Sequence, residues 1–105
     1  MANVMKVKMT RHAVEDRLDR LAACIEHLGV GEVVLENRHY GAIQKLTSTG
    51  LCLVCGEDGI LITGYMCEIR QCSAMYHANG YEKIPEGIYK TVVRNQKKYR
   101  FLLDM

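Results

Sequence analysis

Polar and apolar residues alternate at the start of the chain and then give way to a helical period. Between residues 5 and 9 apolar side chains alternate with two lysines, which predicts a half-buried edge strand. Thr10 offers an N-cap for a helix from about Arg11 to Leu28, where apolar residues recur at spacings of three and four. The recurring residues are Val14, Leu18, Leu21, Ile25 and Leu28. Gly29 and Gly31 are expected to end this helix.

Short apolar runs separated by turn residues occupy the middle of the chain and predict three or four strands. The expected strands are residues 32–36, 42–47, 51–55 and 60–66. Gly56 and Gly59 bound the turn between the last two runs, which predicts a tight hairpin. Because both of its strands are almost wholly apolar, we expect this hairpin at the centre of the sheet, covered on both faces.

The last third of the chain predicts two helices. A short helix is expected from about Cys67 to His77, ended by Asn79-Gly80 as a left-handed cap. Pro85 suits the first turn of a final helix that runs to about Leu103, with Ile88, Val92, Tyr99 and Leu102 inward. The whole pattern predicts an α+β fold, in which a small antiparallel sheet of about four strands carries an N-terminal helix and two C-terminal helices.

Length and composition fit one domain. At 105 residues, with 49% hydrophobic and 25% charged residues, the chain has material for a single core, so residues 1–105 are expected to fold together. No apolar run approaches the roughly 20 residues that cross a bilayer, and the N-terminus lacks the apolar block of a signal peptide. We therefore expect a cytoplasmic protein with no membrane partner.

Positive charge is concentrated near the C-terminal end, although the net charge is only +2. No acid lies between Gly87 and Leu103, whereas several cations do. They are Lys90, Arg94, Lys97, Lys98 and Arg100. Such segregation favours RNA or another polyanion as the partner, because each phosphate contact releases counterions. The alternative is an ordinary solvated face, whose cations also stabilise the C-terminus of the helix.

The first helix carries a second group of candidate residues. His12 lies in its first turn, away from the apolar stripe, where the helix N-terminus favours the neutral imidazole that can act as a base. Arg20 lies on the same side and Arg17 nearer the edge of that side, so one anion along the helix could meet both guanidinium groups. Alternatively, nearby acids pair with these arginines on an ordinary charged surface.

Two hydroxyl groups in the expected strand 60–66 are also candidates for chemistry. Thr63 and Tyr65 are two residues apart and therefore share one face, while Gly64 leaves space on the opposite face. The pair could hold or protonate a phosphate. The alternative is ordinary packing, with both hydroxyls satisfied by their neighbours.

The cysteines leave a structural zinc site open as an alternative. Cys52, Cys55, Cys67 and Cys72 have the spacing C-x2-C-x11-C-x4-C, but the second pair is wrongly spaced for the common zinc ribbon. A regular strand would also point Cys52 and Cys55 to opposite faces. Buried, reduced thiols are therefore favoured, and neither a metal nor another cofactor is expected. The sequence contains no motif for nucleotide-dependent or serine-hydrolase chemistry.

The order of these features resembles a family of small ribonuclease toxins. A short strand, then Thr10-Arg11-His12-Ala13 opening a helix with arginines downstream, then a hairpin ending in an I/V-T-x-Y strand, is similar to BrnT and its relatives in the barnase, EndoU, colicin and RelE superfamily. The likeness covers roughly residues 7–66. Arg17 follows His12 by five residues rather than the usual four, so Arg20 is the better match, and Leu21 stands where a glycine is common.

The resemblance implies metal-independent cleavage of RNA by a toxin-like protein, with an antitoxin or a host target as a further partner. His12 would be the general base or acid, and Arg17 and Arg20 would stabilise the charge on the phosphorane. Thr63 or Tyr65 would orient the phosphate or supply a proton. Two other interpretations stay open. One is a non-catalytic, phage-type inhibitor or binding module that uses the basic C-terminal helix, and the other is a plain structural or zinc-stapled module.

Overall fold

The computed structural model describes the backbone of residues 11–104 and the side chains of residues 18–104. The strand expected at residues 5–9 and the Thr10 cap therefore lie outside the described residues. The elements are α1 (Arg11–Leu28), β1 (Val33–His39), β2 (Ala42–Thr47), β3 (Leu51–Gly56), β4 (Leu61–Met66), α2 (Ile69–Ala78), α3 (Glu86–Lys98) and the 3-10 helix η2 (Arg100–Leu103).

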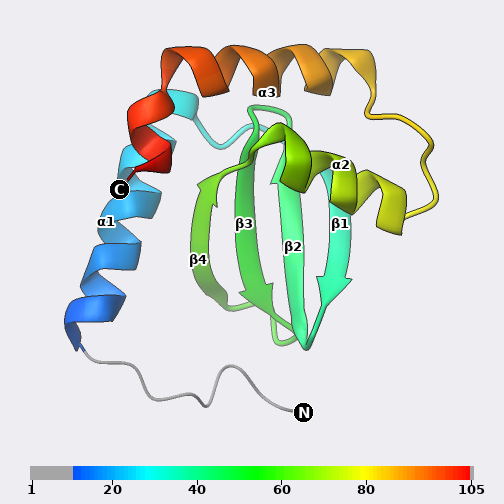
Figure 1. Ribbon diagram of the computed structural model, residues 1–105. Helices are drawn as coiled ribbons and strands as arrows, with labels where there is room; N and C mark the ends of the chain where they lie inside the picture. The colour runs from blue at the N-terminus through cyan, green and yellow to red at the C-terminus, as the bar shows by residue number, and fades with distance from the viewer. Residues whose placement is uncertain (1–10, 105) are drawn as a thin grey trace.

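The described strands form one antiparallel sheet in the order β1-β2-β3-β4, so each strand pairs with the next along the chain. α2 covers one face of this sheet, α1 lies beside β4, and α3 crosses one end of the strands (Figure 1). The predicted α+β fold, with an N-terminal helix and two C-terminal helices, is confirmed. No described helix combines the length and the apolar content that crossing a bilayer requires.

One buried cluster joins α1 to the sheet and to η2. Its members are Leu21, Cys24, Leu51, Met66 and Leu102. The predicted apolar stripe of α1 is partly wrong, because Leu18 and Ile25 are 52% and 37% exposed while Cys24 is fully buried. Since the sheet ends at β4, it covers only a narrow stripe of the helix, and residues on the flank of that stripe stay in contact with solvent.

A second buried cluster lies between the opposite face of the sheet, α2 and α3. Its members are Leu35, Leu46, Cys52, Cys67, Cys72, Met75, Tyr76 and Val92. Alternate residues of β3 divide between the two clusters, so that Leu51 packs on the α1 side and Cys52 on the α2 side. The expectation that β3 is covered on both faces is therefore confirmed.

The predicted hairpin is present, but its expected place at the centre of the sheet is wrong. β2 and β3 are the inner strands, and β4 is an edge strand that passes almost directly into α2. β4 is apolar because helices cover it, and not because a further described strand lies beside it. β1 also runs to His39, beyond the expected end, because its pairing with β2 continues to His39 opposite Ala42; the Asn37 side chain also donates a hydrogen bond to Gln44 of β2 at 2.9 Å.

The final helix is broken where the sequence predicted a continuous one. α3 ends at Lys98, Tyr99 leaves the helical region with φ −118° and ψ 34°, and η2 follows. The break turns the chain, so that Val92 enters the α2 cluster while Leu102 enters the α1 cluster. Burial of apolar residues on both sides of the sheet thus overrides the helical continuity that the local sequence favours.

Gly64 allows α1 to pack directly against β4. A Cβ atom built on this residue would lie 2.5 Å from Cδ1 of Leu21 and 3.2 Å from the carbonyl oxygen of Cys52. The space that the sequence predicted opposite Thr63 and Tyr65 is therefore real, and the Leu21 side chain fills it.

We expect Gly64→Ala to lower the free energy of unfolding by roughly 1–3 kcal/mol, because the added methyl group overpacks the contact with Leu21. Urea denaturation followed by circular dichroism measures this change. Gly87→Ala is the matched control. Its Cβ would meet no atom within 4 Å, so stability should stay the same or rise by up to about 1 kcal/mol. Equal stability of Gly64→Ala and the wild type would show that α1 does not approach β4 this closely.

Candidate functional site

A pocket of about 350 Å³ lies along the outer edge of β4. Residues from α1, β4, the start of α2 and η2 form its walls. They are Arg20, Thr63, Gly64, Tyr65, Met66, Glu68, Gln71, Leu102 and Leu103. β4 is the last of the described strands, so no other strand in the described part of the chain pairs with this side of it. The edge position, which the sequence did not predict, is what creates the pocket.

Arg20, Thr63 and Tyr65, three of the predicted catalytic residues, line this pocket together. Arg20 reaches it because it precedes Leu21, the residue that packs on Gly64. His12 and Arg17 belong to the backbone of α1, but their side chains lie outside the described part of the chain. The described members of the predicted constellation therefore meet at one place, from two elements far apart in the sequence.

Tyr65 lines the pocket, whereas its hydroxyl is engaged with the neighbouring strands. The hydroxyl oxygen accepts a hydrogen bond from Nε2 of Gln44 at 3.3 Å and also interacts with the Cys52 thiol. Burial, followed by the nearby Cys52, raises the pKa of the Tyr65 phenol, which keeps it neutral. Thr63 is thus the better placed of the two for donating a hydrogen bond to a ligand in this pocket.

Glu68 and Gln71 line the same pocket, and the sequence analysis missed both. They form a capping box at the start of α2. The Glu68 amide donates to Oε1 of Gln71 at 2.9 Å, and the Glu68 side chain accepts from the Gln71 amide. The spacing of a residue with a side-chain acceptor and a glutamine three positions later was a signal that could have located this helix start. The capping box holds a carboxylate in a pocket that also contains a guanidinium group.

All five cysteines are buried and free. Cys67 and Cys72 interact through their thiols, and this hydrogen bond, followed by burial, raises the pKa of Cys67. Burial raises the pKa of the Cys52 thiol to about 11. The described side chains include no group of three or more histidine, cysteine or acidic residues arranged to hold a metal ion. The expected burial of these thiols is confirmed.

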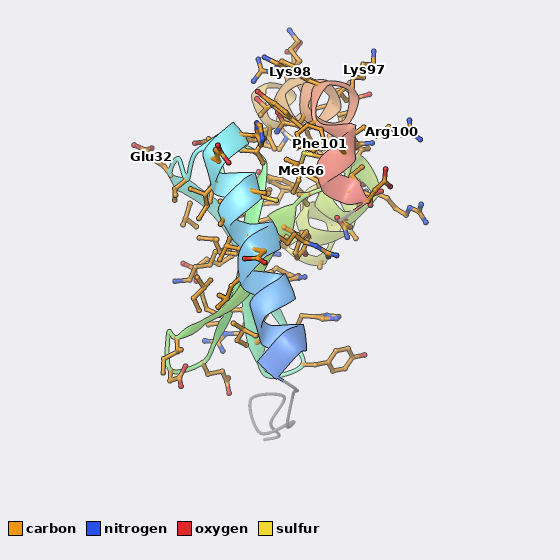
Figure 2. The ribbon with its side chains drawn as sticks, turned by 90° about the vertical axis from the view of Figure 1, so that its left-hand side faces the viewer. Glu32, Met66, Lys97, Lys98, Arg100 and Phe101 are labelled. Atoms are coloured by element: carbon orange, nitrogen blue, oxygen red, sulfur yellow. The ribbon has the colours of Figure 1, made fainter. Side chains whose placement is uncertain are left out.

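The basic C-terminal residues extend from α3 into η2 and are exposed. Lys90 pairs with Glu86 one turn earlier at 3.1 Å, which is an ordinary surface ion pair. Lys97, Lys98 and Arg100 lie where α3 meets η2 (Figure 2). The structure therefore presents cations of the predicted binding face on the surface, on a broken helix instead of a straight one.

No protein-family model, curated protein or solved structure matches this chain. The resemblance to the RelE superfamily therefore stays a prediction from the sequence.

Folding stability should fall as pH rises from 9 to 11. The pKa of Cys52 is raised from 9.0 to about 11 in the folded protein. The contribution of the protonated Cys52 thiol to folding stability is therefore complete below pH 9 and is lost as pH rises through 11. For this one thiol the loss by pH 11 is roughly 2 kcal/mol. Urea titrations at several pH values measure it, and Cys52→Ala should flatten the decline. Cys55→Ala controls for the loss of a buried sulfur, and an equally steep decline in Cys52→Ala would contradict the assignment.

Proposed function

We propose that this protein acts on RNA and cleaves it in the pocket beside β4, without a metal ion. The observation that carries the proposal is the convergence of Arg20 and Thr63 on one pocket with Glu68. A guanidinium group can hold two oxygens of a phosphate, a hydroxyl can donate to a third, and a carboxylate can accept a proton. This set of groups matches the needs of a phosphodiester.

The proposed reaction is attack by the ribose 2′-hydroxyl on the adjacent phosphate. The 2′-oxygen bonds to phosphorus as its proton passes to a base. The bond from phosphorus to the 5′-oxygen then breaks as that oxygen gains a proton, which leaves a cyclic phosphate and a 5′-hydroxyl. Arg20 stabilises the negative charge that builds on the phosphorane, and Thr63 orients one of its oxygens. Arg17 assists in the same way.

In this proposal, His12 and Glu68 transfer the protons. Glu68 is held in place by the capping box, so its carboxylate is fixed before a substrate arrives. His12, in the first turn of α1, serves as the partner acid or base. Tyr65 forms a wall of the site, since its hydroxyl is already bonded within the sheet.

Arg20→Ala should reduce RNA cleavage at least 100-fold, because the developing phosphorane loses its cation. Cleavage of a labelled RNA, with EDTA in the buffer, measures the rate. His12→Ala and Thr63→Val should also reduce it, and thermal melts should show that all three variants still fold.

Arg38→Ala is the matched control for the loss of an arginine. Arg38 lies on β1, the opposite edge strand, and pairs with Glu57 at 3.1 Å on the surface. Its loss should leave the rate unchanged. Cleavage that survives both His12→Ala and Arg20→Ala would remove the nuclease proposal.

A second candidate function is non-catalytic binding through the basic C-terminal residues. It is favoured by the exposure of Arg94, Lys97, Lys98 and Arg100 in a segment without acids. The partner would be RNA or another polyanion, or a protein such as an antitoxin or a host target. In the EDTA assay this function predicts intact RNA that is bound at low salt and released at high salt.

A further inference from the structure

A second pocket, of about 310 Å³, lies where the end of α1, the turn between β2 and β3, and α3 meet. Arg94 and Lys98, one turn apart on α3, line it on one side. His27 of α1 and Ser48 of the turn line the other sides. No aspartate or glutamate is among its lining residues. Two cations without an opposing carboxylate make this a site for an anion.

The polar floor of this pocket is fixed by hydrogen bonds. The Thr49 hydroxyl donates to the Gly29 carbonyl at 2.8 Å, and Nδ2 of the buried Asn95 donates to the Thr49 carbonyl at 2.7 Å. The Ser48 hydroxyl accepts a bond from the Glu32 amide at 3.0 Å, so its own proton can be donated to a ligand. The turn is thus held in place by α1 and α3, and no rearrangement is needed for it to meet an anion.

An exposed aromatic ring lies next to the pocket. Phe101 of η2 is 50% exposed and packs edge-on against His27 with ring centroids 5.1 Å apart. Tyr99, which lines the pocket, lies 6.4 Å from the same ring. Figure 2 shows Phe101 on the side of η2 that faces α1, and the Lys98 ammonium lies 5.3 Å from the centre of the Tyr99 ring. Aromatic rings beside cations are the features with which proteins hold single-stranded nucleic acid, because bases stack on the rings while cations meet the phosphates.

We propose that this second pocket binds single-stranded RNA, with a phosphate between Arg94 and Lys98 and an adjacent base stacked on Phe101. The inference rests on the proposal that the protein acts on RNA. η2 separates the two pockets, since Phe101 lies beside this one and Leu102 and Leu103 line the one beside β4. A single-stranded RNA that crosses η2 can therefore occupy both pockets at once.

Binding of a labelled 2′-O-methyl oligouridine, followed by fluorescence anisotropy, tests this subsite. This RNA has no free 2′-hydroxyl, so cleavage cannot interfere. Lys98→Gln should weaken binding about fivefold or more. It should also reduce the slope of log affinity against log salt concentration by about one, which corresponds to the loss of one phosphate contact. Lys83→Gln removes the same charge from the loop before α3, outside the pocket, and should change affinity less than twofold. Phe101→Leu should weaken binding about tenfold with little effect on the salt dependence.

A crosslinking experiment on the wild type keeps the test independent of whether the variants fold. The same oligomer with a 4-thiouridine should crosslink under ultraviolet light to residues 99–101. Equal losses in Lys83→Gln and Lys98→Gln, no loss in Phe101→Leu, or tighter binding of an RNA duplex would each overturn the subsite. Absence of any binding would overturn it as well, whereas the cleavage assay judges the pocket beside β4 separately.

Discussion

The contact between Leu21 of α1 and Gly64 of β4 determines where the candidate groups lie. It brings the helix within van der Waals distance of an edge strand, and the neighbouring Arg20 is thereby carried to the outer side of that strand. A side chain at position 64 would collide with Leu21, so the Leu21 side chain or α1 itself would have to shift. A packing requirement in the core therefore sets the electrostatics of the surface pocket.

The break at Tyr99 has a comparable effect on the other end of the molecule. It allows Val92 and Leu102 to be buried on opposite sides of the sheet, and it leaves η2 as a short wall with Phe101 exposed on it. Two pockets result, one on each side of this wall. The pocket beside β4 would lose one wall if the helix ran straight to Leu103, because Leu102 and Leu103 would then not reach the edge of β4.

The sequence predicted where helices and strands lie along the chain better than it predicted which of them contact one another in the fold. The extent of α1, the turn at Gly56 and Gly59, and the pairing of Thr63 with Tyr65 on one face are local patterns, and all appear in the structure. The edge position of β4 and the place of Glu68 depend on contacts between distant segments, which a local pattern does not contain. The hydroxyl of Tyr65 could not be assigned either, because its partner Gln44 lies on another strand.

Helix α1 also relates the two pockets to each other. Arg20 and His27 are seven residues apart, which places them on the same side of the helix at a separation of about 10 Å along its axis. The helix is stiff over such a distance, so the two pockets keep a constant spacing. If RNA fills both pockets as proposed, the distance between its bound groups must match this spacing, whatever the base sequence of the RNA.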